Sequence, residues 1–265
     1  MKDYIDIADN VYFGTYKLTN EKVLLNALFN AFNAGYKKFD CAELYKNQAV
    51  IGKFVRHIGR LNIWLTSKIS FRVIPKGEAA IRASIEKTLA DLRCGYLDLM
   101  LIHSPSGDEN DLMAWRILQE YKKRGLILNI GISNYNLEKL QNFIEDIEEA
   151  GWSKNDIFCN QIEFNPFLNR KELIDYCQDA GIKIVTYGNL YYTNEFIEDL
   201  AKRLGRTRRQ VLARYAIHKG FEPILMAEDS THIWENIELE FEIDKKDIEV
   251  LDGFHNGQSQ YKRYL

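Results

Sequence analysis

Four side chains with acid–base chemistry follow successive apolar runs in the first half of the chain: Asp40, Tyr45, Lys68 and His103. A tyrosine with its reference pKa of about 10 is a weak acid or base near neutral pH. A neighbouring ammonium favours the phenolate form, and a carboxylate beside the lysine would keep that ammonium charged. If the fold brings them together, these four groups can transfer a proton to or from a substrate oxygen.

Eight short β-rich segments are available to position such side chains. Several are nearly continuous apolar runs, as is typical of strands covered on both faces. The segments are 11–16, 36–40, 61–67, 96–102, 126–132, 157–162, 182–187 and 222–226.

Helical patterns lie between these segments. Residues 21–35 place apolar side chains on one stripe, with Asn20 as the expected N-cap and Gly35 just past the end. After the seventh strand the helix is expected to be doubled, from about 193 to 204 and again from Thr207. Eight alternating units predict a (β/α)8 TIM barrel that forms a single domain over residues 1–265. A doubly wound open sheet is disfavoured as a dinucleotide-binding fold, because neither G-x-G-x-x-G nor a P-loop is present.

Composition limits the classes of partner. The net charge is −3, from 35 basic and 38 acidic residues, which predicts no binding of nucleic acid or of an anionic membrane. No run approaches the roughly 18 apolar residues of a membrane helix and no signal peptide is recognised, so a cytoplasmic protein is expected. The dispersed cysteines and histidines offer no metal site, and the oligomeric state is not indicated.

In barrels of this type the active site forms at the C-terminal ends of the strands. Each candidate alone has a structural explanation, such as a helix cap, a packed tyrosine or a surface lysine. Their common placement favours a functional site. The residues expected at the barrel mouth are Gly14, Thr15, Tyr16, Asp40, Tyr45, Ser67, Lys68, His103, Ser133, Asn134, Gln161, Glu163, Tyr187, Gly188 and Met226.

From residue 14 to residue 244 the chain resembles the aldo-keto reductase family. Matching stretches include NAGYKKFDCAELY (33–45), WLTSK (64–68), DLRCGYLDLMLIHSP (91–105) and NQIEFNPFL (160–168). The resemblance implies that Tyr45 protonates a carbonyl oxygen as hydride arrives from a nicotinamide cofactor. Lys68, paired with Asp40, would lower the pKa of Tyr45, and His103 would orient the carbonyl.

The resemblance also implies a cofactor site without a Rossmann turn. Tyr187 would stack on the nicotinamide ring, and Ser133, Asn134 and Gln161 would hold its carboxamide. Glu235 and Asn236 match the family's adenine contacts. The full set of expected cofactor contacts is Gly14, Thr15, Tyr16, Asp40, Ser133, Asn134, Gln161, Tyr187, Gly188, Glu235 and Asn236.

The chain departs from the family pattern at several places. Residues 46–48, which follow the catalytic tyrosine, read Lys-Asn-Gln where the family commonly has Gly-Asn-Glu. The loop after Tyr187, which helps to cover the pyrophosphate in the family, is short. The tail, 255–265, is shorter than the long tails of some members, which predicts an open substrate site.

The last strand carries the most informative departure. In the family, a lysine and an arginine bind the NADP 2′-phosphate; their positions here hold Met226 and His232. The position of the serine that follows the lysine holds Ala227. NADH is therefore a candidate beside NADPH, since Glu228 or Asp229 can accept a hydrogen bond from a ribose 2′-hydroxyl. Both acids can equally cap the following helix.

Three functions stay open from the sequence. The first is an oxidoreductase that uses NAD or NADP to reduce an aldehyde, ketone or sugar-like carbonyl. The second is a non-redox barrel enzyme, such as an isomerase, dehydratase or lyase, that reuses the same four residues. The third is a non-catalytic interaction protein. Retention of all four acid–base residues favours an enzyme.

Overall fold

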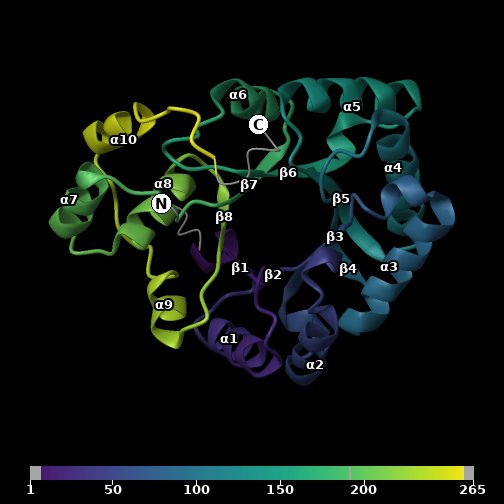
Figure 1. Cartoon of the computed structure of the whole chain (residues 1–265), viewed down its shortest axis with the longest axis horizontal. Coiled ribbons are helices and arrows are strands. Elements are labelled where there is room, and N and C mark those ends of the chain that lie inside the picture. The colour runs from purple at the N-terminus through teal and green to yellow at the C-terminus, as the bar shows by residue number, and fades with distance from the viewer. Residues whose placement is uncertain (1–6, 191, 260–265) are drawn as a thin grey trace, which may run out of the picture.

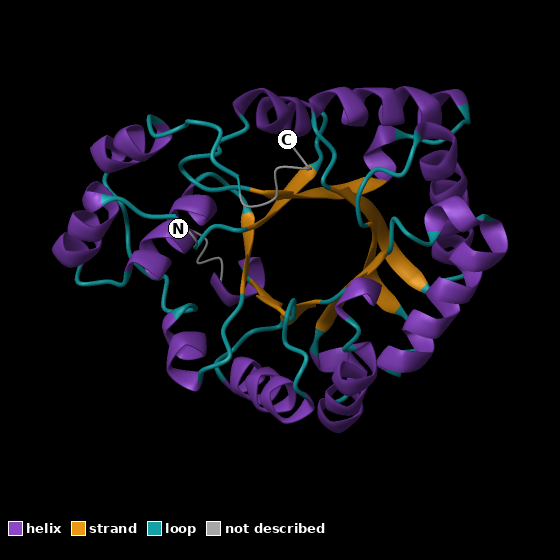
Figure 2. Ribbon diagram, viewed as in Figure 1, coloured by secondary structure: helices purple, strands orange, loops and turns teal. Residues whose placement is uncertain are grey.

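Eight parallel strands close into a barrel in the computed structural model, which describes residues 7–190 and 192–259. The strands follow chain order around the ring, and β8 pairs with β1 to close it. Figure 2 shows this ring with helices around its outside. The predicted (β/α)8 TIM barrel is confirmed. The strands are β1 Tyr12–Gly14, β2 Lys38–Asp40, β3 Trp64–Ile69, β4 Leu97–Ile102, β5 Ile127–Ser133, β6 Ile157–Glu163, β7 Lys183–Tyr187 and β8 Glu222–Leu225.

Helices connect the strands and cover the outer face of the barrel (Figure 1). Asn20 caps the first helix by accepting a hydrogen bond from the Val23 N–H at 3.1 Å, as predicted. The helix after β7 is doubled, and Thr207 caps the second part. The helices are α1 Glu21–Asn33, α2 Gln48–Ile58, α3 Glu78–Leu92, α4 Asp108–Lys123, α5 Leu137–Glu149, α6 Lys171–Asp179, α7 Glu195–Leu204, α8 Arg208–His218, α9 Ser230–Glu235 and α10 Lys245–Asp252. Short 3₁₀ helices are η1 Ile7–Asn10, η2 Glu43–Tyr45, η3 Arg60–Asn62, η4 Ile74–Lys76 and η5 Lys154–Asp156.

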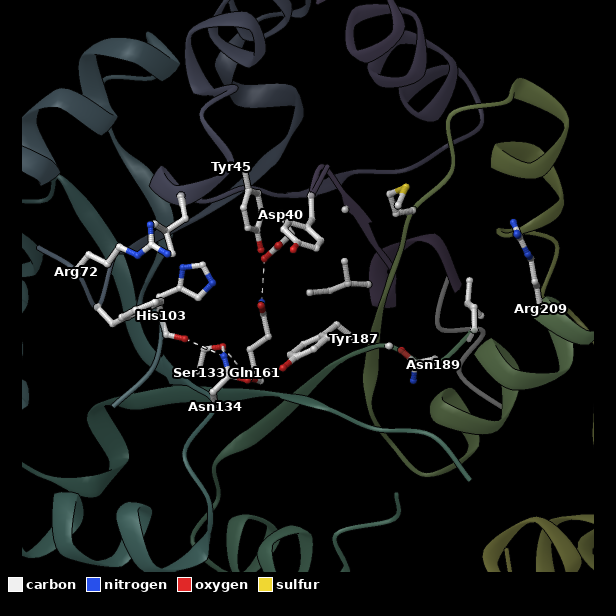
Figure 3. Close-up of a pocket in the computed structure, with 18 residues that line it drawn as sticks. Asp40, Tyr45, Arg72, His103, Ser133, Asn134, Gln161, Tyr187, Asn189 and Arg209 are labelled. Atoms are coloured by element: carbon white, nitrogen blue, oxygen red, sulfur yellow. Dashed lines mark hydrogen bonds between the residues drawn. The ribbon is translucent and has the colours of Figure 1, made fainter. Parts of the chain in front are cut away.

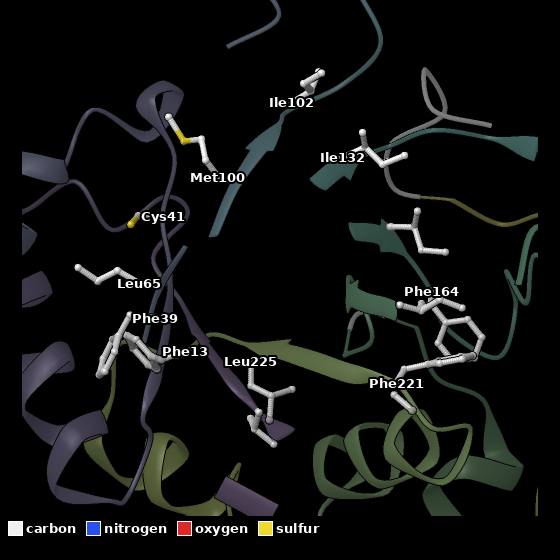
Figure 4. Close-up of a cluster of buried hydrophobic side chains, with 14 of the residues drawn as sticks. Phe13, Phe39, Cys41, Leu65, Met100, Ile102, Ile132, Phe164, Phe221 and Leu225 are labelled. Carbon is white, nitrogen blue, oxygen red and sulfur yellow. The ribbon is translucent and has the colours of Figure 1, made fainter. Parts of the chain in front are cut away.

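Side chains alternate along the strands between two apolar clusters. Phe13, Phe39 and Leu65 belong to the larger cluster, which packs between the strands and the helices (Figure 4). Tyr12 and Leu99 belong to a smaller cluster inside the barrel. Because successive strand residues point to opposite faces, polar side chains at alternate positions near the strand ends face inward. The barrel thus aims its functional candidates at one mouth.

Strand β8 is the most lightly paired part of the ring. It pairs with β1 through Ile224 and Leu225, and with β7 through Glu222 and Pro223. Pro223 has no N–H to donate to a neighbouring strand. Across the barrel base, Lys38 of β2 forms an ion pair with Glu222 at 2.7 Å, which ties β8 to the start of the barrel.

Within residues 7–190 and 192–259, no helix has the length and apolar character needed to cross a bilayer. The same residues contain no group of three or more His, Cys, Asp or Glu side chains placed to hold a metal ion. All four cysteines are buried and unbridged.

Candidate active site

Asp40, Lys68 and Tyr45 form a hydrogen-bonded chain at the barrel mouth. The Lys68 ammonium donates to Asp40 Oδ1 at 2.6 Å, to the Cys41 carbonyl at 3.0 Å and to the Tyr45 hydroxyl at 3.3 Å. The lysine is 1% exposed and the aspartate 2% exposed. A buried ammonium and carboxylate are stable only as a pair, so each fixes the charge and position of the other. The predicted proximity of these three groups is confirmed.

The predicted effect on Tyr45 is wrong in direction. Burial, followed by the negative charge of Asp40, raises the pKa of Tyr45 well above 10. The reason is that Lys68 is already held by a carboxylate and a backbone carbonyl. Its net electrostatic pull on the phenol is therefore small compared with the cost of burying a phenolate. Tyr45 is a protonated phenol at neutral pH, which is the form of a proton donor.

His103 lies beside Tyr45 on the loop after β4. Its backbone N–H donates to the Ile69 carbonyl at 3.1 Å, and its own carbonyl accepts from Asn134 Nδ2 at 2.9 Å. The rings of His103 and Tyr45 meet edge to face, with centroids 5.9 Å apart. Tyr16 packs against the same phenol ring at 5.1 Å. The histidine is thus anchored where it can contact a group that Tyr45 protonates.

The loop that carries Tyr45 is braced by residues 46–48, of which Lys46 and Gln48 depart from the family pattern and Asn47 matches it. Lys46 ends η2 in a left-handed conformation, with φ of 57°. The side chain of Asn47 donates to the carbonyls of Thr15 and Leu18, and Gln48 Oε1 accepts from the Ser67 hydroxyl at 2.6 Å. These contacts tie the start of α2 to the β1–α1 loop and to strand β3, so Asn47 and Gln48 hold the loop that carries Tyr45 in place.

A second polar cluster forms at the ends of β5, β6 and β7. Asn134 donates to Ser133 Oγ at 3.0 Å and accepts from the Tyr187 hydroxyl at 2.5 Å. Gln161 donates to Asp40 Oδ2 at 2.9 Å and so links the two clusters. Asn134 has φ of 65°, an uncommon backbone conformation that the surrounding contacts must maintain. The four residues expected to contact nicotinamide therefore lie together at the strand ends, and their contact with a cofactor stays a prediction.

A pocket of about 490 Å³ opens above both clusters (Figure 3). Its volume lies within the range of roughly 300–1,000 Å³ typical of small-molecule sites. Its lining residues are Gly14, Tyr16, Asp40, Leu44, Tyr45, Phe71, Arg72, His103, Ser133, Asn134, Gln161, Tyr187, Gly188, Asn189, Leu190, Arg209, Ile224 and Met226.

Four of the predicted catalytic and cofactor-binding residues do not line this pocket, and neither do Ser67 and Glu163, which were expected at the mouth. Lys68 acts from beneath Tyr45. Thr15 is fully buried and donates its hydroxyl to the Asp40 carbonyl at 2.9 Å, so it supports the strand instead of facing a ligand. Glu235 and Asn236 end α9, away from the pocket wall. The Glu235 carbonyl accepts from Gln210 of α8 at 3.0 Å.

The pocket also includes residues that the sequence reading missed. Leu44, Phe71 and Arg72 lie in loops after β2 and β3, and their position after strand ends was an available signal. Arg209 lies in the first turn of α8, and nothing in its sequence context indicated that this side chain reaches the mouth.

At the end of β8, Asp229 caps α9. Its Oδ1 accepts from the backbone N–H groups of Thr231 at 2.9 Å and His232 at 3.3 Å, so the capping interpretation holds for this acid. Met226 lines the pocket, Ala227 is buried, and His232 is exposed. None of these three positions carries Lys or Arg, so the residue that lines the pocket at the end of β8 is the apolar Met226.

The described start of the C-terminal segment crosses the loop after β6. The N–H groups of Asn256 and Gly257 both donate to the Phe167 carbonyl at 3.1 Å. The Ser259 hydroxyl donates to Glu163 Oε2 at 2.5 Å, and Glu163 is fully buried at the end of β6. The expected open substrate site depends partly on residues 260–265, which lie outside the described residues.

The mouth fits a nicotinamide ring by its shape and its polar atoms. Tyr187 presents an aromatic wall, and its hydroxyl is fixed by Asn134. Gly14 also lines the pocket and has no side chain; a Cβ there would meet Ile224 Cγ2 at 2.7 Å. Gly188 has φ of 73°, and a Cβ there would meet Glu163 Cγ at 3.0 Å. Both glycines keep the mouth open beside the polar cluster.

Comparisons with known proteins agree with this geometry. Residues 10–256 match the Aldo/keto reductase family. The chain is similar to glyoxal reductase of Bacillus subtilis, with 30% identity over 92% of this chain and 88% of the relative. It is similar to aldo-keto reductase family 1 member C23 of Equus caballus, with 30% identity over 92% and 87%.

Solved structures give the same result. The chain superposes on MGS-M4, an aldo-keto reductase from a Medee basin deep-sea metagenome library, with a TM-score of 0.87, 25% identity and coverage of 94% and 92%. The aldose reductase of Schistosoma japonicum gives a TM-score of 0.84, 25% identity and coverage of 95% and 90%. The chain belongs to the aldo-keto reductase family of oxidoreductases.

Proposed function

We propose that this barrel reduces the carbonyl group of an aldehyde, ketone or sugar-like compound with a nicotinamide cofactor. The observation that carries the proposal is the buried Asp40–Lys68–Tyr45 chain, which ends at a pocket lined by Tyr45 and His103. When bound, the reduced cofactor supplies a hydride to the carbonyl carbon. Tyr45 donates a proton to the carbonyl oxygen, so that the products are an alcohol and the oxidised cofactor.

The remaining residues stabilise this proton transfer. The Lys68 ammonium, 3.3 Å from the Tyr45 oxygen, stabilises the phenolate that forms as the proton leaves. Asp40 keeps Lys68 in position. His103, whose ring meets that of Tyr45, donates a hydrogen bond that orients the carbonyl oxygen. Solvent returns the proton to Tyr45 after the alcohol leaves.

Acceptance of NADH is part of the proposal. At the end of β8 the wall residue is Met226, and His232 is exposed on α9, so this segment brings no lysine or arginine to a 2′-phosphate. Glu228 is exposed and can accept a hydrogen bond from a ribose hydroxyl. Parallel fluorescence titrations with NADH and NADPH test this part, and a clear preference for NADPH would contradict it.

Tyr45→Phe tests the catalytic assignment. We expect kcat for aldehyde reduction to fall about 10²–10⁴-fold, because the general acid is lost while the ring is kept. Cofactor affinity is expected to stay close to that of the wild type, since the ring packing is unchanged. Turnover of a substrate without any cofactor would favour a non-redox enzyme. A variant equal to the wild type in every assay would favour a non-catalytic protein.

A further inference from the structure

The pocket has one end that the proposed cofactor does not use. Figure 3 shows Arg72 at the end where Tyr45 and His103 lie, and Arg209 with Asn189 at the opposite end. Tyr187 and Ser133, the expected nicotinamide neighbours, lie between them. The space beyond Tyr45 therefore belongs to the part of a substrate that extends away from its carbonyl group.

The walls of this end are apolar except for one cation. Leu44 and Phe71 supply the apolar surface. Arg72 also lines the pocket, and its guanidinium lies 5.6 Å from the Phe71 ring. An aromatic or aliphatic substrate body fits between these side chains.

Within the part of the chain that the structure describes, the exposed side chain of Arg72 has no acidic counter-ion. Among the described residues its guanidinium forms no ion pair and no hydrogen bond to an acid; only its backbone N–H is bonded, to Ser70 Oγ at 3.1 Å. The acid that lines the pocket, Asp40, is bound to Lys68 at 2.6 Å. Glu43, the acid of the neighbouring loop, accepts from the Ser70 N–H at 3.2 Å and does not line the pocket.

We propose that the substrate carries an anionic oxygen group, a carboxylate or a phosphate ester, which Arg72 binds while the carbonyl lies at Tyr45 and His103. Guanidinium binds such groups through charge-assisted, often bidentate hydrogen bonds. A neutral compound of the same shape leaves the cation unpaired. This inference rests on the proposed function for the identity of the reacting group, but the anion site itself is independent of the chemistry.

Matched substrate pairs test the inference. 4-Carboxybenzaldehyde is compared with its neutral carboxamide, and glyceraldehyde 3-phosphate with glyceraldehyde. We expect a higher kcat/KM for the anionic member of at least one pair, and the larger ratio identifies carboxylate or phosphate as the group. In Arg72→Gln, kcat/KM for that anionic member is expected to fall about 10- to 100-fold, mainly through KM. Arg72→Lys is expected to restore part of the loss.

Lys76→Gln is the matched control. It removes one positive charge from the same β3–α3 connection, from an exposed side chain that does not line the pocket. We expect it to leave both members of each pair unchanged. Equal losses for the neutral and anionic members in Arg72→Gln would show a structural role and overturn the proposal. So would equal kcat/KM within both pairs in the wild type.

A binding measurement separates this inference from the proposed reaction. Calorimetric titration with 4-(hydroxymethyl)benzoate, the alcohol product, needs no turnover. Binding that weakens in Arg72→Gln and not in Lys76→Gln supports the anion site even if no aldehyde is reduced. Absence of reduction with either nicotinamide would count against the proposed function alone, and binding unaffected by Arg72→Gln would count against the anion site alone.

Discussion

At the scale of single residues, burial favours the protonated form of Tyr45, the proposed proton donor. The Tyr45 pKa is raised well above 10 by burial and by Asp40, while Lys68 is held by Asp40 and the Cys41 carbonyl. The tyrosine is therefore protonated before the reaction begins. In the proposed reaction, the role of the lysine is to stabilise the phenolate that proton donation leaves, and not to lower the pKa of the resting tyrosine.

This assignment predicts a flat pH profile for carbonyl reduction. A raised pKa keeps the acid form present at all pH values below it, so the donor is lost only as pH rises through that raised value. We expect kcat for reduction to stay constant from about pH 7.5 to 9.5, a range across which a tyrosine with a pKa lowered to about 8 would lose most of its proton. Steady-state rates across this range measure the effect. A fall centred near pH 8 would contradict the assignment.

At the scale of elements, α8 contributes a cation to the end of the pocket opposite Arg72 (Figure 3). Arg209 lines the pocket and has no ion-pair partner among the described residues. The next residue, Gln210, donates to the carbonyls of Glu235 and Glu238, which joins α8 to the segment expected near adenine. We therefore propose that Arg209 binds the pyrophosphate of the cofactor.

Arg209→Ala is therefore expected to weaken NADH and NADPH binding alike, by about tenfold, because both share the pyrophosphate. Arg208→Ala is the control, since Arg208 pairs with Glu198 at 3.3 Å and does not line the pocket. Fluorescence titration of both cofactors gives the answer. Loss of NADPH affinity alone would place the 2′-phosphate, and not the pyrophosphate, at Arg209.

Asp111, in the first turn of α4, is a buried acid whose ionised form destabilises the folded protein. Asp111 accepts from the Ser106 N–H through both oxygens, and burial raises its pKa to about 7. The folded state thus binds more protons than the unfolded state between about pH 4 and 7, so this residue lowers stability as pH rises through that range. In Asp111→Asn, that pH-dependent loss is expected to disappear, with a difference on the order of 2 kcal/mol. Urea unfolding of the wild type and the variant at pH 5 and pH 8 measures this difference. If the free energy of unfolding changed equally with pH in both proteins, the expectation would be contradicted.

At the scale of the whole molecule, an ion pair at the base connects the beginning and the end of the barrel. Lys38 and Glu222 are 2.7 Å apart, with side chains 17% and 15% exposed. Lys183 lies 4.0 Å from the same glutamate and is more exposed. Removing one partner leaves a largely buried charge, which is destabilising.

We expect Lys38→Met to lower the free energy of unfolding by about 2–4 kcal/mol. The double variant Lys38→Met with Glu222→Gln is expected to recover part of that loss, because it leaves no unpaired charge. Chemical denaturation of the wild type, Lys38→Met, Glu222→Gln and the double variant gives a double-mutant cycle, which measures the interaction energy of the pair. Strictly additive losses would show that the pair contributes nothing specific.

Much of the fold and part of the site follow from local sequence. The eight strands were predictable because a parallel strand covered on both faces is an apolar run, and its first polar residues, such as Asp40 and Ser133, mark the mouth. The pKa of Tyr45 was not predictable, since it depends on burial and on how Lys68 is shared. Arg72 and Arg209 were missed because their directions are set by a loop and by the packing of a helix end.

Because β8 is lightly paired, hydrogen exchange of its backbone amides can be used to detect a bound cofactor. Pairing limited to two residues on each side, with a proline among them, lets amide hydrogens of this strand exchange with solvent sooner than those of β4 and β5. The strand leads directly into Met226 at the pocket wall. A bound cofactor should therefore slow deuterium uptake most clearly along β8, so that occupancy of the site can be followed by mass spectrometry without any substrate.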